Sequence, residues 1–192
     1  MLKKNIYIHI EVLSRELPSQ LLLSIFALKK NFRVHLGDLY SLKKLFILKK
    51  KKQDIFIATG NLDKETHKLI KKKCEKLVSL DQEITPGFSD KYNEYLIKSR
   101  YSYNIKNFDI FFCINKTIKK NFIKNLNLKK NKVIASGWPR FDLYKTEFRN
   151  LYSKEVSQLR KKFGTYFLFN SDFGCLSNED RTNQYKFLKK HT

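Results

Sequence analysis

Apolar runs of strand length alternate with helix-length amphipathic segments along most of this chain. That order constrains the fold most, because successive β-α-β units build a parallel sheet with right-handed crossovers and helices on both faces. It predicts an α/β fold with a Rossmann-like parallel sheet. The predicted strands are Asn5–Ile10, Arg33–Leu36, Asp54–Ala58, Lys76–Leu80, Phe108–Ile114 and Lys132–Ser136, separated by helices at Ser14–Lys30, Leu39–Lys50, Asp63–Lys73, a short helix within 84–107, and Lys116–Leu126.

The first of these helices carries a Leu-rich stripe. Its spacing predicts that the stripe is buried against the sheet. Pro18 is expected in the first turn, where a missing backbone N–H is tolerated. The residues predicted to be buried are Leu21, Leu22, Ile25, Phe26 and Leu28.

The organisation changes after the sixth predicted strand. One long amphipathic helix is predicted at Glu147–Phe163, with Gly164 directly after it as the C′ residue, and a further strand is predicted at Thr165–Asn170. A lone strand with so little chain after it cannot bury itself. We therefore expect a Rossmann-like domain at 1–145, a connecting helix at 146–164 and, at 165–192, the beginning of a truncated second α/β domain; the alternative is that this last piece packs on the first domain.

The formal net charge is +22, from 40 Lys and Arg residues against 18 Asp and Glu residues. Because the Lys residues are spread over helices and loops, we do not expect nucleic-acid binding. A solvated surface shaped by AT-rich codons explains the excess most simply, and attraction to an anionic membrane surface is the alternative. Neither a spanning segment nor a signal peptide is recognisable, so we expect a cytoplasmic protein, at most peripheral at the inner face of the cell membrane.

Three cysteines, Cys74, Cys113 and Cys175, lie far apart with no paired spacing. This pattern favours neither a disulfide framework nor a metal site. His9 and His35 fall inside predicted strands and are expected to be core residues.

Polar residues at the ends of the predicted strands are the candidate site residues, because open parallel sheets bind ligands at the carboxyl ends of their strands. Asp81 and Glu83 follow the fourth strand. Paired carboxylates can supply a catalytic base or nucleophile, since their surroundings can separate their pKa values. The alternative is that one carboxylate caps a turn and the other is solvated.

A second group of candidates lies in the sequence Gly-Trp-Pro-Arg-Phe-Asp at 137–142. Arg140 offers a planar fork suited to a carboxylate or phosphate, and Asp142 would lie beside it. These two side chains could instead pair with each other and brace the connection between domains. Asn170, Asp172 and Gly174 follow the last predicted strand, where a strand-to-helix loop commonly approaches phosphates.

These residues resemble a known family. The run GWPRFDLY at 137–144 resembles the Gly-x-Pro-Arg-Phe-Asp-Leu-Leu signature of bacterial surface carbohydrate biosynthesis proteins, and 148–164 and 167–174 resemble the helix, strand and loop that follow it there. Asp81-Gln82-Glu83 resembles the Asp-Glu-Glu of that family, and 10–17 fits its opening. The resemblance spans essentially the whole chain but about the first half of a typical member. Trp138, Gln82 and Ile84 depart from the usual Asn, Glu and Gly.

Such proteins are similar to GT-B glycosyltransferases and, more distantly, to CDP-glycerol glycerophosphotransferases. The resemblance implies an acceptor-side domain that helps transfer a sugar to a surface glycan or a lipid-linked glycan. The donor would be a nucleotide-sugar, with a CMP-linked ulosonic acid as one candidate, and no other cofactor is implied. It also implies that Asp81 or Glu83 is catalytic and that Arg140, Asp142, Asn170, Asp172 and Gly174 lie near the cleft.

Two alternatives to this function remain open. One is transfer of a polyol phosphate. The other is a non-catalytic remnant or binding module, because catalysis needs both walls of a cleft and this chain supplies one. A second subunit could complete the cleft.

Overall fold

The computed structural model describes residues 4–48, 53–59, 62–80, 82, 90–101 and 107–168. The chain divides into two compact units, Met1–Arg149 and Asn150–Thr192. In the described part of the chain no helix is both long and apolar enough to cross a membrane.

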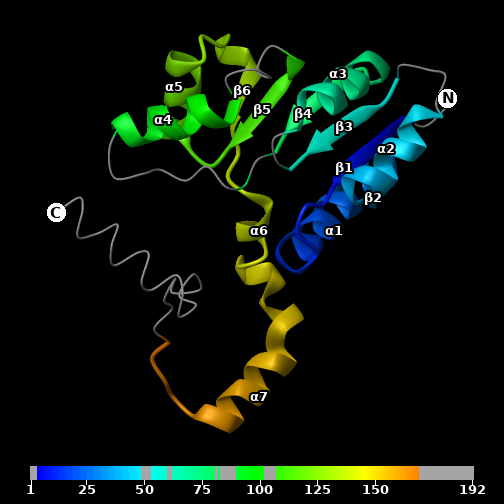
Figure 1. Cartoon of the computed structure of the whole chain (residues 1–192). Helices are drawn as coiled ribbons and strands as arrows, with labels where there is room; N and C mark the ends of the chain where they lie inside the picture. Colours follow the sequence, from blue (N-terminus) through cyan, green and yellow to red (C-terminus); the bar gives the residue numbers. More distant parts are fainter. Residues whose placement is uncertain are drawn as a thin grey trace, which may run out of the picture. The chain divides into compact units, whose positions relative to one another are not determined.

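The first unit contains a six-stranded parallel sheet, as the alternation of apolar runs predicts (Figure 1). Its strands lie side by side in the order β2-β1-β3-β4-β5-β6. Strand β2 therefore lies on one side of β1, and β3 to β6 follow one another on its other side, so that the strand order reverses between β1 and β3. The strand bounds are β1 Asn5–His9, β2 Arg33–Gly37, β3 Ile55–Ala58, β4 Lys76–Ser79, β5 Ile110–Cys113 and β6 Val133–Ala135.

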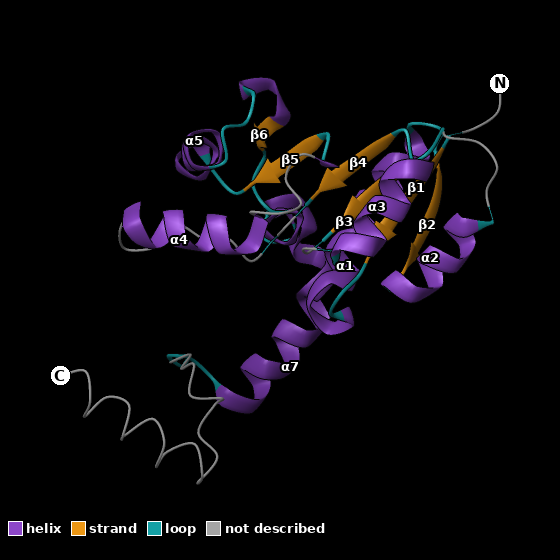
Figure 2. Cartoon of the chain, turned by 45° about the horizontal axis from the view of Figure 1, so that its top comes forward, coloured by secondary structure: helices purple, strands orange, loops and turns teal. Residues whose placement is uncertain are grey.

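Helices connect the strands (Figure 2). The helix bounds are α1 Leu13–Lys29, α2 Leu39–Ile47, α3 Lys64–Lys73, α4 Asp90–Tyr101, α5 Lys116–Asn125 and α6 Pro139–Asp142. Asp38, Asp63 and Asn115 cap α2, α3 and α5 by accepting backbone N–H groups of the first turn. Such caps each stabilise a helix by about 1 kcal/mol. The N-cap residue of α1 is Val12, which makes no side-chain cap bond.

The two faces of the sheet carry different cores. Tyr7 of β1 packs into the larger core, whereas its neighbours Ile6 and Ile8 point to the other side, as alternation along a strand requires. The larger core contains buried side chains of α2, α3, α4 and α5, namely Leu42, Phe46, Ile70, Ile97, Tyr101, Ile118 and Phe122. The smaller core contains Ala27 and Leu23 of α1. The helices therefore lie on both faces, with α2, α3, α4 and α5 on one side and α1, which packs against α6, on the other.

The exposed and buried faces of α1 contradict the sequence prediction. Leu21, Ile25, Phe26 and Leu28 are exposed, and Leu22 is only half-buried. The buried positions are instead Glu16, Ser19, Gln20, Ser24 and Ala27. The buried side chains at Ser24 and Ala27 are small, whereas four large apolar side chains lie on the exposed side of the helix. Pro18 was also misplaced, because α1 begins at Leu13 and Pro18 lies beyond its first turn.

The chain after α6 differs from the predictions in two respects. A 3-10 helix occupies Thr146–Tyr152, and the α-helix α7 begins only at Ser153 and ends at Phe163. The Ser153 hydroxyl donates to the carbonyl of Asn150, a local bond that competes with continuous α-helix. Gly164 ends α7 with a φ of 65°, which confirms its predicted position.

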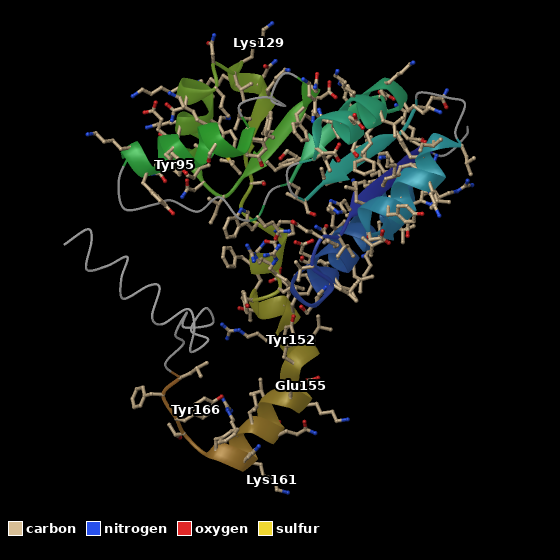
Figure 3. The ribbon with its side chains drawn as sticks, viewed as in Figure 1. Tyr95, Lys129, Tyr152, Glu155, Lys161 and Tyr166 are labelled. Carbon is tan, nitrogen blue, oxygen red and sulfur yellow. The ribbon has the colours of Figure 1, made fainter. Side chains whose placement is uncertain are left out.

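The strand predicted at Thr165–Asn170 is wrong for residues 165–168, which form no strand. Phe167 is fully exposed there, since no neighbouring strand pairs with this segment. Residues 169 and 170 lie outside the described residues. Tyr152, Glu155, Lys161 and Tyr166 are labelled in Figure 3, and all four side chains are exposed.

Candidate functional site

The reversal of strand order between β1 and β3 marks the place where a ligand crevice is expected in a sheet of this kind. The carboxyl ends of these two strands carry His9 and Thr59. Thr59 Oγ1 lies 3.3 Å from His9 Nδ1. His9 is 6% exposed and Thr59 is 2% exposed, so the pair is largely shielded from solvent.

Glu16 of α1 lies in the same region and is also buried. Its Oε2 accepts the backbone N–H of Glu11 at 2.8 Å, and its Oε1 accepts from Nη2 of Arg15 at 2.9 Å. These bonds compensate a buried carboxylate, which would otherwise be costly. They also hold the β1–α1 connection against the start of the helix.

Burial lowers the pKa of His9 below the usual 6.5, and the nearby carboxylates of Glu16 and Asp38 oppose that shift only in part. The imidazole is therefore neutral at pH 7. A neutral imidazole can accept a proton from a hydroxyl group, which is the role of a general base.

Arg140, a predicted binding residue, lies in α6 directly after β6. Its guanidinium donates a hydrogen bond to the backbone carbonyl of Gln82, and its Cζ lies 4.5 Å from the centre of the Trp138 ring. Gly137 has a φ of 81°, the left-handed conformation that glycine adopts readily, so the chain can turn tightly between β6 and α6.

Asp142, the second predicted residue of α6, does not pair with Arg140. It forms an ion pair of 2.7 Å with Lys145, one turn further along the chain. The sequence-based alternative in which Arg140 and Asp142 brace each other is therefore wrong. The two side chains have separate partners.

The remaining predicted site residues, Asp81, Glu83, Asn170, Asp172 and Gly174, lie outside the described residues. Gln82 is described and is 2% exposed. Its carbonyl accepts from Arg140, while its side-chain amide has no hydrogen-bond partner within the described ranges. The bond from Arg140 links α6 to the chain just after β4, on the same edge of the sheet as His9.

A cavity of about 270 Å³ lies on the α1 side of this edge. Most of its wall is apolar, and Ser136 and Asp142 supply polar groups. Its volume is close to the lower end of the range for small-molecule pockets, roughly 300 Å³, and its mixture of lining groups fits such a pocket. The lining residues are Leu23, Ile57, Leu80, Phe112, Ser136, Gly137, Pro139 and Asp142.

Other polar residues at the strand ends have structural partners. Asp38 and Asn115 act as helix caps. Glu11 is exposed, and its Oε2 lies 3.9 Å from Nη2 of Arg15. Cys113 is buried, and burial raises the pKa of its thiol to about 11. Over the residues that can be described, no cluster of His, Cys, Asp or Glu has the arrangement of a metal site.

His9, Thr59 and Glu16 are the site residues that the sequence reasoning missed. The sequence predicts His9 as a core residue, and its burial confirms that prediction. The strand order also places His9 at the point where a ligand crevice is expected. Its place at the end of β1 was visible in the sequence. What the sequence did not give was that β1 and β3 are neighbours at the reversal point, so that His9 meets Thr59.

Comparison with known proteins does not assign this chain to a family. No family, no curated protein and no solved structure matches the chain.

Proposed function

We propose that this chain is the acceptor-side part of a glycosyltransferase that transfers a sugar from a nucleotide-activated donor to a bacterial surface polysaccharide. The observation that carries the proposal is the neutral, buried His9, bonded to Thr59 at the reversal point of a parallel sheet. Glycosyl transfer needs a group that removes a proton from the acceptor hydroxyl, and the carboxyl edge of the sheet offers one.

In the proposed reaction, the acceptor hydroxyl oxygen bonds to the anomeric carbon of the donor sugar. The bond from that carbon to the nucleotide phosphate breaks, and the nucleotide leaves with the electron pair. The hydroxyl proton passes to the base. His9 is the candidate base among the described residues, whereas Asp81 and Glu83 are the candidates that follow from the family resemblance.

The apolar cavity beside α6 supports an acceptor role for this edge. Its wall is suited to the apolar part of a lipid-linked glycan or to the face of a sugar ring. Arg140 is held by the Gln82 carbonyl and the Trp138 ring near this wall. In the proposal it orients the loop and the acceptor, and Asn170, Asp172 and Gly174 contribute to the donor side.

The test is a donor and acceptor panel with the protein that contains this chain. Nucleotide release and sugar incorporation into a surface glycan are measured with CMP-, UDP- and GDP-sugars. We expect His9→Gln to lower kcat by about a hundredfold or more, the usual scale for removing a general base. His35→Gln is the matched control. His35 also lies in a β-strand and has a polar partner, since its Nε2 lies 3.2 Å from Oδ1 of Asn5.

Parallel variants, Asp81→Asn and Glu83→Gln, identify the base. If either removes turnover while His9→Gln leaves it intact, the base is a carboxylate and His9 is structural. Consumption of CDP-glycerol with no sugar donor used would instead favour polyol-phosphate transfer. Acceptor binding with no turnover of any donor, even with the complete polypeptide, would overturn the enzymatic proposal in favour of a binding module.

A further inference from the structure

Helix α1 has its polar and apolar faces reversed relative to an ordinary surface helix. Four large apolar side chains, Leu21, Ile25, Phe26 and Leu28, form what we call the outer face of α1 and are 46%, 50%, 54% and 56% exposed. On the buried side lie Ser19, Gln20 and Ser24. Gln20 is fully buried, and its side-chain amide has no hydrogen-bond partner within the described ranges.

This reversal indicates that the outer face has a partner. Surface helices normally turn their apolar stripe to the core, and a helix that is apolar on its outward side is normally covered there as well. Contiguous exposed apolar patches of this kind mark sites of contact with a protein or a membrane. The partner must therefore accept large aliphatic and aromatic side chains.

Charge distinguishes between these partners. The segment from Leu17 to Leu28 contains no charged residue. The only acidic residue of α1, Glu16, is buried and bonded to Arg15, whereas Lys29, Lys30 and Arg33 at the other end are exposed. Burial of apolar side chains at the lipid boundary and attraction of cationic side chains to anionic headgroups are the two contributions that hold a helix in the interface of an anionic bilayer.

The whole chain strengthens this preference. A net charge of +22 attracts the chain to an anionic surface and repels a second copy of itself. The apolar residues of α7 are a weaker candidate, because Val156 and Leu159 already line a hollow with Thr165 and Tyr166 of their own unit.

We propose that α1 docks this protein on an anionic membrane surface, with its outer face inserted at the level of the lipid headgroups and Lys29, Lys30 and Arg33 against the phosphates. The occupant is the bilayer itself. This inference does not rest on the proposed glycosyl transfer, since vesicle binding is measured without donor or acceptor.

The test is co-sedimentation of the protein with vesicles of phosphatidylcholine containing phosphatidylglycerol, compared with vesicles of phosphatidylcholine alone. We expect binding to the anionic vesicles only. Phe26→Glu should weaken that binding by about tenfold or more, because a charge replaces an apolar side chain at the lipid boundary. Thermal unfolding of the variant checks that the fold is intact, which is expected because Phe26 is half exposed.

Phe163→Glu is the matched control. Phe163 of α7 is also 54% exposed, so the two variants change the same side chain at the same exposure and alter net charge equally. The proposal requires Phe163→Glu to change binding by no more than about fivefold, the effect of one charge near the membrane surface. Should Phe26→Glu itself fail to fold, Ile25→Ser serves in its place.

Three results would overturn the proposal. One is equal weakening by the two Phe variants, which would make the attraction purely electrostatic. Another is absence of binding to anionic vesicles at low salt. The third is a stable dimer in sedimentation that Phe26→Glu dissociates, which would make the outer face a protein interface.

Discussion

Helix α1 and the helices on the opposite face of the sheet pack against the same six strands in different ways. On the opposite face, α2, α3, α4 and α5 join one apolar core that includes Tyr7, Phe56 and Phe111 of the sheet. On the other face, α1 contributes Leu23 and Ala27 and buries several polar groups. Four helices cover one face, whereas the other face has α1 with the short helix α6 packed against it.

The two faces of the sheet differ in how much they stabilise the fold and in how many groups they leave available for contact with other molecules. The larger core is rich in aromatic pairs, such as Phe108 with Phe111 at a ring separation of 5.0 Å. On the α1 side lie the cavity beside α6, the buried Gln20 and the exposed outer face. We conclude that the first face supplies stability and that the second carries the candidate contacts.

The largest effect expected from this comparison comes from truncating a core side chain on each face. Phe111→Ala should lower the free energy of unfolding by about 4 kcal/mol, because Phe111 is fully buried among aromatic rings. Leu23→Ala should cost about 1 to 2 kcal/mol, because Leu23 is only half-buried. Urea unfolding of both variants measures the difference. Equal losses would show that the two faces stabilise the sheet equally.

A second prediction concerns acid and His67, which α3 packs against Phe108 in the larger core. Burial, aided by Lys71, lowers the pKa of His67 from 6.5 to about 4, so folding favours the neutral ring. Because the unfolded chain binds the proton more tightly, stability should fall as the pH drops from 6.5 towards 4, by about 3 kcal/mol. His67→Leu should remove that part of the pH dependence, measured by urea unfolding across this range. If the dependence of stability on pH is unchanged in His67→Leu, burial does not lower the pKa of His67 in the folded protein.

The smallest effect expected is at the buried polar side of α1. Gln20→Leu should raise the free energy of unfolding by about 1 kcal/mol, because it replaces an unpaired buried amide with an apolar side chain of similar size. Thermal unfolding measures the shift. Ser24→Ala is the comparison, since it removes a bond that exists, from Ser24 Oγ to the Gln20 carbonyl, and should not stabilise. A loss on Gln20→Leu would show that the amide is paired in solution.

Much of the first unit could be predicted because strand and helix patterns are local. All six strands occur near their predicted positions, and Gly164 ends α7 with a positive φ at the predicted place. The burial of α1 could not be predicted in the same way. Its Leu-rich stripe has the spacing of a core-facing helix, and which side faces the sheet depends on how closely the strands let it approach.

The candidate site shows the same division. Arg140 was found because it belongs to a recognisable turn after a strand, yet its partner, the Gln82 carbonyl, is far away in sequence. Likewise, no local signal joins His9 to Thr59. The predicted strand at Thr165–Asn170 failed over 165–168 for the related reason that a strand needs a neighbour, which an apolar run does not by itself provide.

The sequence by itself determined the elements of this protein: its strands, its capped helices, its turns and its cationic surface. These depend on side-chain periodicity, backbone conformation and charge, which are properties of short segments. Only the tertiary structure decided the strand order, the neutral pair of His9 with Thr59, and the outward face of α1. Each of these depends on which segments become neighbours, and that is settled by packing of the whole sheet.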